Sequence, residues 1–397
     1  MDILFYDSEV SIEKLLPFTF TRPISEIRIG IFKISEKWRH HFKGEVYFKT
    51  SPHLSNKFSD QFKKGLIING GLCPSTELTE KINALRAGQA LFSNETFLAA
   101  KAESALSDIN VLFEEYERLD YHDNFTIIEN SWNIFQFNAE QIEADIEIIR
   151  SQRTSAKIED PHTILYGDNI FIEEGATIRA SILNSEKGPI YIGKNSKVYE
   201  GSIINGAFAL CEEAHLNIGA KVKGDTTIGP YSKAGGEISN SVLFGYSNKG
   251  HDGFLGNSVI GEWCNLGADT NTSNLKNNYA PVKLWDYSTQ GFKDTGLQFC
   301  GLMMGDHAKC GINTMFNTGT VVGVGANVFG AGFPRNYIPE FAWGGAHGYS
   351  TFKLSKFFET AEKVMERREI ELTTEDRDIF EWIYQNSEKN RFWEQTK

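Results

Sequence analysis

A six-residue spacing of apolar side chains is the sequence feature that most restricts the fold. The longest run of this spacing comprises Met304, Cys310, Phe316, Val322 and Val328. Two shorter runs comprise Ile192, Val198 and Ile204, and Phe254, Ile260 and Leu266. A period of six is typical of a parallel β-helix, where each hexad forms one flat face of a triangular coil and its apolar side chain points inward. We therefore expect a solenoid whose turns use glycine where a side chain would clash.

The distribution of glycine divides the chain into three regions. Of 36 glycines, 6 precede residue 151, 30 lie between Gly167 and Gly348, and none follows. We expect an α/β domain over residues 1–150, a β-helix over 151–348 and a helical cap over 349–397. In the first region "DILFY" and "KGLIING" read as buried strands, and the stretch from Ser75 to Gly88 as a capped helix. Such alternation of strands and helices is typical of a layered α/β domain.

The glycine-free tail carries apolar residues at helical spacing in "TFKLSKFFETAEKVMERR" and "TTEDRDIFEWIYQ". Thr373 or Thr374, ahead of Glu375 and Asp376, predicts the start of a helix. We expect two amphipathic helices to cover the open end of the solenoid, because that end otherwise exposes unpaired strand edges.

The composition favours a soluble cytoplasmic protein. Hydrophobic residues make up 41% and charged residues 23% of the 397 residues, and the formal net charge is −12. Without a basic block, this charge argues against nucleic-acid binding. The start "MDILFYDSEV" does not resemble a secretory signal, and no apolar stretch approaches a membrane span. Five cysteines without paired spacing indicate neither disulfides nor a zinc knuckle.

The segment "YSNKGHDGFLG", Tyr246 to Gly256, interrupts the hexad rhythm. Such a break indicates a loop leaving the solenoid wall, and repeat proteins place function in loops of this kind. This loop carries Lys249, His251 and Asp252. Histidine titrates near neutrality and can take a proton from an attacking amine or hydroxyl. The alternative is a turn histidine without a chemical task.

The segments "NKGHDGFLG" and "IGEWCNLGADTNTSNLK" resemble the acetyltransferase half of a bifunctional family. That family is N-acetylglucosamine-1-phosphate uridylyltransferase / glucosamine-1-phosphate N-acetyltransferase. The resemblance implies a left-handed β-helix, acetyl-CoA as cosubstrate, an amino-sugar 1-phosphate as acceptor, and a homotrimer with acetyl-CoA between neighbours. We expect Trp263 and Trp285 to supply apolar surface for subunit packing. No metal is required for acetyl transfer.

The resemblance also implies roles for individual residues. His251 matches the general base, and Asn274 matches the asparagine that orients the acceptor amine and CoA. Asn265 matches an acceptor-site residue, and Ala268 matches the alanine whose backbone N–H contacts the acetyl group. In "FPRNYIPEF", Arg335 matches a basic residue near a CoA phosphate.

Two departures from the family leave the acceptor open. The family's tyrosine three places after the histidine is Phe254, and the segment from Asn274 to Gly301 is longer. Lys276 or Lys283 replaces the family's acceptor-binding lysine. We also assign Lys249 to the acceptor site.

The stretch "KLLPFTFTRPISEIRIG" resembles the signature of sugar nucleotidyltransferases, which would use UTP or dTTP. In that family a glycine-rich loop holds the triphosphate through backbone N–H groups, whereas this chain has "FYDSEVSIE". Ile24 replaces the phosphate lysine, and Asn69 stands where the family has a magnesium-binding aspartate. Lys14 and Arg22 remain as candidate nucleotide contacts. Mg²⁺ is needed only if this domain is active.

Three functions are therefore considered. The first is an enzyme of nucleotide-sugar synthesis that transfers an acyl group from acetyl-CoA, with nucleotidyl transfer in the first domain left open. The second is a non-catalytic regulatory or assembly paralogue. The third is a metalloenzyme of the γ-carbonic-anhydrase type, which needs three converging histidines. His215, His251 and His307 are too widely separated in sequence to favour it.

Overall fold

The computed structural model describes residues 1–104 and 109–395. Contacts within the chain divide it into two compact units. Unit 1 comprises Met1–Leu15, Arg22–Ile27 and Phe32–Asn130, and unit 2 comprises Leu16–Thr21, Arg28–Ile31 and Ser131–Lys397.

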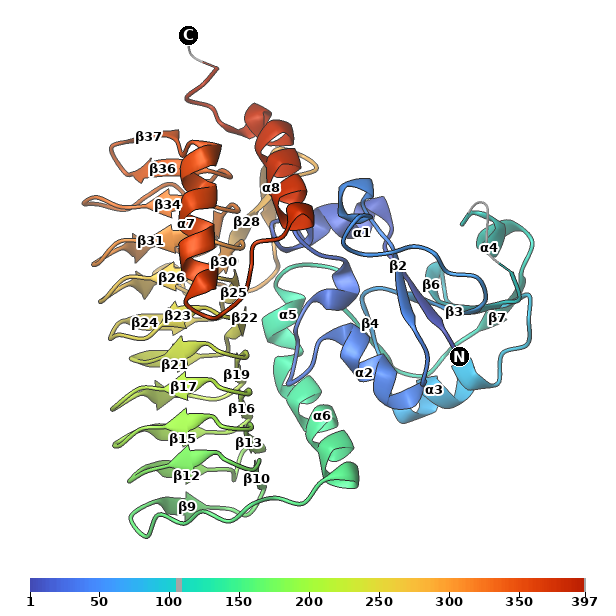
Figure 1. The fold of residues 1–397 in the computed structure, drawn as a ribbon, viewed down its shortest axis with the longest axis horizontal. Helices are drawn as coiled ribbons and strands as arrows, with labels where there is room; N and C mark the ends of the chain where they lie inside the picture. Colours follow the sequence, from blue (N-terminus) through green and yellow to red (C-terminus); the bar gives the residue numbers. More distant parts are fainter. Residues whose placement is uncertain (105–108, 396–397) are drawn as a thin grey trace. The chain divides into compact units, whose positions relative to one another are not determined.

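Unit 1 contains a six-stranded mixed sheet (Figure 1). Its strand order is β2 (Val46–Lys49), β1 (Ile3–Tyr6), β3 (Gly65–Asn69), β6 (Thr96–Ala102), β5 (Gln89–Ser93) and β7 (Glu117–Asp120). A small pair joins β4 (Leu72–Cys73) to β8 (Thr126–Ile127), and the helices are α1 (Glu9–Lys14), α2 (Ile34–His41), α3 (Thr76–Asn83) and α4 (Val111–Glu114). The predicted strands are β1 and β3, and the Ser75 hydroxyl caps α3 by accepting from the amide of Leu78.

Unit 2 is built around a three-faced parallel β-helix that follows α5 (Asn133–Gln136) and α6 (Asn138–Gln152). The first face consists of β10 (Ile170–Ile172), β13 (Ile190–Ile192), β16 (Phe208–Leu210), β19 (Thr226–Ile228), β22 (Val242–Gly245), β25 (Val259–Glu262), β30 (Leu302–Met304), β33 (Thr320–Val322) and β35 (Tyr337–Ile338). The second consists of β11 (Thr177–Ile178), β14 (Lys197–Val198), β17 (His215–Leu216), β20 (Lys233–Ala234), β23 (Asn248–Lys249), β26 (Asn265–Leu266), β31 (Lys309–Cys310), β34 (Asn327–Val328), β36 (Ala342–Gly345) and antiparallel β37 (Gly348–Thr351).

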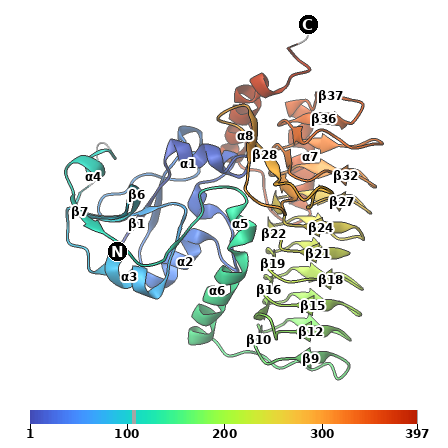
Figure 2. The ribbon, with the colours of Figure 1, turned by 180° about the vertical axis from the view of Figure 1, so that it is seen from behind.

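The third face is visible from β9 to β32 in Figure 2. It consists of β9 (Ile164–Tyr166), β12 (Ile182–Asn184), β15 (Ile203–Asn205), β18 (Lys221–Val222), β21 (Glu237–Ser239) and β24 (Phe254–Gly256), and continues with the pair β27 (Asn271–Thr272) and β32 (Met315–Phe316). Between β27 and β30 the chain leaves the solenoid as an antiparallel hairpin, β28 (Lys283–Asp286) and β29 (Gly291–Asp294). The predicted fold class, an α/β domain followed by a hexapeptide left-handed β-helix and C-terminal helices, is confirmed.

Ten of the eleven residues that the hexad spacing predicted to point inward do so. All five residues of the longest run are buried in one core cluster, as are Ile192, Val198, Ile204, Ile260 and Leu266. The prediction for Phe254 is wrong. Leu255 is fully buried and pairs in register with Ile238, whereas Phe254 points outward and is partly exposed. The loop before β24 shifts the phase of this coil by one residue, which moves the next side chain into the core.

Aromatic rings, rather than glycines, occupy the corner between the first and second faces near the middle of the column. Tyr231, Tyr246, Trp263 and His307 all have φ between 54° and 61° there. Their rings form a continuous stack, with centroids 5.2 Å apart for Tyr231–Tyr246 and 4.2 Å for Tyr246–Trp263. Left-handed backbone costs a non-glycine residue on the order of 1 kcal/mol, and ring stacking offsets part of this. Trp263 is therefore only 7% exposed, so the expectation that it supplies surface for subunit packing is wrong.

The C-terminal helices α7 (Leu354–Glu366) and α8 (Thr374–Asn386) form where expected, with Thr373 and Asp376 making the capping box. They pack beside the last coils (Figure 1) and not over the open end, which they were expected to cover. The Phe357 ring lies 5.1 Å from Phe341 and 4.9 Å from Phe380. The end of the solenoid core is contacted by Tyr349 and Trp393.

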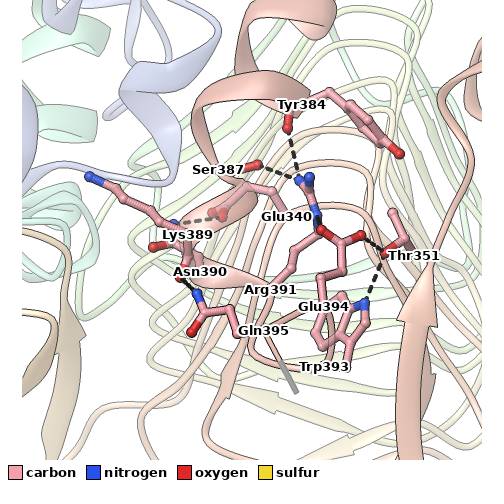
Figure 3. Close-up of polar contacts among 10 residues, drawn as sticks. All are labelled: Glu340, Thr351, Tyr384, Ser387, Lys389, Asn390, Arg391, Trp393, Glu394 and Gln395. Carbon is pink, nitrogen blue, oxygen red and sulfur yellow. Dashed lines mark hydrogen bonds and ion pairs between the residues drawn. The ribbon is translucent and has the colours of Figure 1, made fainter. Parts of the chain in front are cut away.

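The segment after α8 is fastened to the last strands by polar contacts (Figure 3). Arg391 donates to the carbonyl oxygen of Tyr384 and forms an ion pair with Glu394. Thr351 donates to Glu394 and accepts from the Trp393 indole at 2.8 Å. These bonds fix residues 391–394 against β37.

Candidate functional site

The interrupting loop lies at the corner between the second and third faces, between β23 and β24. His251 is exposed there, whereas Lys249 is buried with its ammonium bonded to backbone carbonyls. Gly253 has φ +114°, and a Cβ atom on it would clash with the carbonyl oxygen of Thr270. The loop therefore needs glycine at this position to stack closely on the next coil.

The predicted acceptor and acetyl contacts lie on that next coil. Asn265 pairs in register with Asn248, and its side chain is exposed. The amide of Asp269 donates to the carbonyl oxygen of Asp252 at 3.1 Å. The turn that contains Ala268 therefore stacks directly on the loop that contains His251, and both belong to the same corner of the β-helix.

Asn274 lies at the other end of the third face, just after β27. Its Nδ2 donates to Oδ1 of Asn257 at 2.8 Å. A Cβ atom on Gly256 would lie 2.7 Å from Asn274 Nδ2 and 2.5 Å from the Phe254 ring. The structure thus places His251 and Asn274 at the two ends of one face, with Phe254 between them along the chain.

A pocket of about 660 Å³ brings together Lys276, Lys283 and Arg335. Its other lining residues are Trp285, Phe292, Thr318, Asn336, Tyr337 and Phe392. The Trp285 ring stacks on Tyr337 with centroids 4.2 Å apart and planes inclined by 6°. Trp285 therefore lines this pocket. Its predicted role in subunit packing stays a prediction. Three cationic side chains and flat aromatic walls favour a ligand that combines negative charge with a planar ring.

A buried carboxyl group organises three segments around this pocket. Glu340 is fully buried and accepts from the Tyr287 hydroxyl at 2.6 Å and from Asn390 Nδ2 at 3.2 Å, the latter drawn in Figure 3. The hydroxyl of Tyr337 contacts it at 3.5 Å. Burial raises the pKa of Glu340, although these hydrogen bonds oppose the shift. One side chain thereby joins the hairpin, β35 with the residues that follow it, and the C-terminal segment.

The candidate nucleotide contacts lie in unit 1. Lys14 ends α1 and is exposed, whereas Arg22 is buried. Burial opposes the shift in the pKa of Glu26, but the charge of Lys33 and hydrogen bonds, with a smaller effect of Arg22, lower that pKa overall. Asp7 follows β1, and Asn69 is the last residue of the adjacent parallel strand β3. Both therefore lie at the carboxyl ends of the strands, the edge where open α/β sheets bind ligands. Burial raises the pKa of Asp7 to about 6.

Part of the nucleotidyltransferase-like signature belongs to unit 2 and packs on the solenoid. Thr21 donates to Asp306 at 2.8 Å, and Arg28 Nε donates to the carbonyl oxygen of Phe244 at 2.9 Å. The Phe18 and Phe244 rings lie 5.2 Å apart. These signature residues therefore have structural contacts within unit 2.

Sequence reasoning missed Asn257, Glu340, Tyr337 and Phe392 as members of these sites. Asn257 carries no motif of its own, although its φ of 48° marks a third corner of the β-helix. Phe392 follows the last long helix in a segment without a repeat. Over the described residues no group of three or more His, Cys, Asp and Glu side chains is placed to hold a metal ion. Within those same ranges, no helix has the length and apolar character needed to cross a bilayer.

Comparison with known proteins finds a family model for the first region and curated proteins that are similar to part of the chain. The family model for sugar nucleotidyl transferases matches residues 3–154. The bifunctional protein GlmU of Bartonella quintana is 24% identical over 289 residues, covering 68% of this chain and 55% of that protein. Over these lengths the chain is similar to the GlmU proteins. GlmU of Methanococcus aeolicus is 26% identical over 255 residues, covering 62% of this chain and 57% of that protein. The chain thus spans just over half the length of these relatives.

Solved structures with similar regions include two acyltransferases. The polySia-specific acetyltransferase NeuO is 14% identical, with 49% of this chain and 85% of NeuO covered and a TM-score of 0.27. AntD, an N-acyltransferase from Bacillus cereus in complex with dTDP and 3-hydroxybutyryl-CoA, is 12% identical, with 52% and 91% covered and a TM-score of 0.22.

Proposed function

We propose that the chain transfers an acetyl group from acetyl-CoA to the amine of an amino-sugar 1-phosphate, with His251 as the general base. The observation that supports this most is the stacking of the His251 loop on the turn of Ala268. A base and a backbone N–H donor on adjacent coils are the two groups that acyl transfer requires.

In the proposed reaction the amine nitrogen attacks the thioester carbonyl carbon, forming the C–N bond. His251 accepts the proton that the amine loses. The backbone N–H of Ala268 donates to the oxyanion of the tetrahedral intermediate. The C–S bond then breaks, and CoA leaves as a thiol after taking up a proton. Asn274 and Asn265 orient the acceptor, and neither exchanges a proton.

The pocket of Lys276, Lys283 and Arg335 supplies the remaining binding energy in this proposal. Arg335 contacts a phosphate of CoA, and Lys276 or Lys283 contacts the phosphate of the acceptor. Lys276 already donates to the carbonyl oxygen of Pro281 at 2.8 Å, which holds its ammonium at the pocket wall. The hairpin that carries Lys283 and Trp285 lies between Asn274 and Gly301, in the segment that is longer than in the family. In this proposal the hairpin therefore determines which acceptor binds.

Incubation with acetyl-CoA and a panel of sugar 1-phosphates, followed by measurement of free CoA, tests this function. Release of CoA that depends on one amino-sugar 1-phosphate is the expected result. Absence of release with every acceptor, while the protein remains folded, would favour the regulatory or assembly role.

We further propose that the first domain catalyses nucleotidyl transfer slowly or not at all. The supporting observation is Asp7, a buried carboxyl at the end of β1 in the segment that replaces a glycine-rich phosphate loop. A carboxylate would repel a triphosphate there. Rapid magnesium-dependent release of pyrophosphate from UTP or dTTP with a sugar 1-phosphate would contradict this.

We also propose that the chain forms a homotrimer. Ile218 and Ile312 are 76% and 71% exposed at the same corner as the His251 loop, and Met315 on β32 is 37% exposed. Exposed large aliphatic side chains along one corner of a repeat fold favour burial against a second copy.

A further inference from the structure

Lys249 occupies a position where the β-helix otherwise stacks aliphatic side chains. It pairs in register with Ala234 of the preceding coil, and Leu266 follows in the next coil. Ala234 is fully buried, Leu266 is 2% exposed, and Lys249 is 1% exposed. An ammonium group enclosed in this way costs several kcal/mol unless its donors are satisfied.

The Lys249 ammonium has three acceptors, all of them backbone carbonyl oxygens. It donates to His251 at 2.5 Å, to Asp252 at 3.1 Å and more weakly to Gly235 at 3.4 Å. An ammonium has three donors and no acceptor, so this set matches its capacity. Burial lowers the pKa of Lys249 to about 8, and the nearby Asp252, Cys310 and Asp269 oppose the shift.

The remaining carbonyls of the loop are also bonded. Asn217 donates to the carbonyl oxygen of Gly250 at 2.7 Å, and the amide of Glu237 donates to that of Gly253 at 3.1 Å. All four carbonyl groups of residues 250–253 therefore accept hydrogen bonds, two of them from Lys249. Because the carbonyls of His251 and Asp252 turn toward the buried ammonium, the orientation of this backbone depends on it.

We propose that Lys249 is a positioning residue that fixes the backbone under His251 from inside the solenoid and does not contact the acceptor. This inference rests on the proposed function, and it replaces the expectation that Lys249 belongs to the acceptor site. The ammonium lies inside the core, so a sugar phosphate could reach it only by displacing the loop that carries the base.

Lys249→Met tests this, because methionine has a similar length and no donor. Lys309→Met is the matched control. Lys309 is a half-buried lysine on β31 that donates to the carbonyl oxygen of His307 at 2.9 Å. Acetyl transfer to glucosamine 1-phosphate is measured as kcat and KM, and amide hydrogen exchange is followed in residues 250–253.

For Lys249→Met we expect kcat to fall by roughly 10- to 100-fold, since a displacement of about 1 Å at a catalytic group costs up to this much. KM for the acceptor should change by less than about threefold, and exchange should accelerate in residues 250–253. Lys309→Met should alter neither kcat nor exchange in this loop. If Lys249→Met does not fold, Lys249→Gln retains two N–H donors and should give a smaller change in the same direction.

A raised acceptor KM with unchanged kcat would overturn the proposal and return Lys249 to the acceptor site. Unchanged exchange in residues 250–253 would also overturn it. The exchange measurement does not depend on catalysis. If wild-type protein lacks acetyl transfer but Lys249→Met still loosens the loop, the proposed function fails while the structural role of Lys249 stands.

Discussion

The guanidinium carbon of Arg335 lies 4.4 Å from the centroid of the Phe392 ring. This contact joins the segment between β34 and β35 to the segment after α8. Both residues line the pocket of Lys276, Lys283 and Arg335. The ring covers one side of the guanidinium. A cation–π contact of this kind contributes about 0.5–1 kcal/mol at a partly exposed site.

Phe392→Ala should therefore raise KM for acetyl-CoA roughly two- to fivefold, with kcat little changed. The control is Phe358→Ala, which removes a similar contact with Arg377 at 4.9 Å on the C-terminal helices. Steady-state kinetics with varied acetyl-CoA separate the two variants. An equal rise in KM for both would show that the effect comes from general loosening of the C-terminal helices.

Asn257 should position Asn274 through their 2.8 Å hydrogen bond. Asn257→Gly removes the acceptor oxygen and tolerates the positive φ of 48° without strain. We expect Asn257→Gly and Asn274→Ala each to lower kcat by roughly tenfold and the double variant to be no worse than the single ones, because residues acting as a unit are not additive. Additive losses in this double-mutant cycle would contradict the coupling.

Asp7 should make unit 1 less stable as the pH rises from about 4 to about 6. Its folded pKa is raised from 3.8 to about 6 by burial, so the folded state binds more protons than the unfolded state in this range, and the free energy of unfolding falls as pH rises. Asp7→Asn should abolish this slope and raise the free energy of unfolding at pH 7 by on the order of 2 kcal/mol. Urea unfolding at several pH values measures it, with the exposed Asp120→Asn as control. If the free energy of unfolding of Asp7→Asn still falls between about pH 4 and about pH 6, the pH dependence belongs to another group.

The trimer proposal predicts a mass three times that of the 44.7 kDa chain in sedimentation at micromolar concentration. Ile312→Lys should shift the population toward monomer, because it places a charge in the buried contact. Val10→Lys replaces a similarly exposed residue on α1, at 62% exposure, and should leave the mass unchanged. A monomeric wild-type protein would refute the proposal.

The inward positions of the solenoid were predictable because a period of six constrains them from both neighbours. Phe254 was misassigned because the loop changes the phase of one coil, and no local residue preference reports such a change. The burial of Lys249 was not predicted, because a lysine beside a glycine-rich loop ordinarily lies at the surface. The corner stack of Tyr231, Tyr246 and Trp263 was missed because positive φ in aromatic residues runs against backbone preference.

The candidate site was predictable only as separate residues. The motif around His251 located the loop. The resemblance suggested Arg335 as a CoA contact, and Lys276 or Lys283 as the acceptor-binding lysine, without indicating that the three lie together. Their convergence depends on the path of the hairpin and on the Glu340 network, which joins segments far apart in sequence. Contacts between segments that are far apart in the chain produce no repeating pattern in the sequence.

The most direct test compares CoA release by wild type and His251→Ala across pH, with acetyl-CoA and the best acceptor. The exposed His347→Ala is the control. The wild-type rate should rise with pH through the range in which an imidazole loses its proton. His251→Ala should lose this limb and fall in turnover by roughly a hundredfold or more, with KM for acetyl-CoA little changed. Near-normal turnover with the same pH dependence in His251→Ala would contradict His251 as the general base.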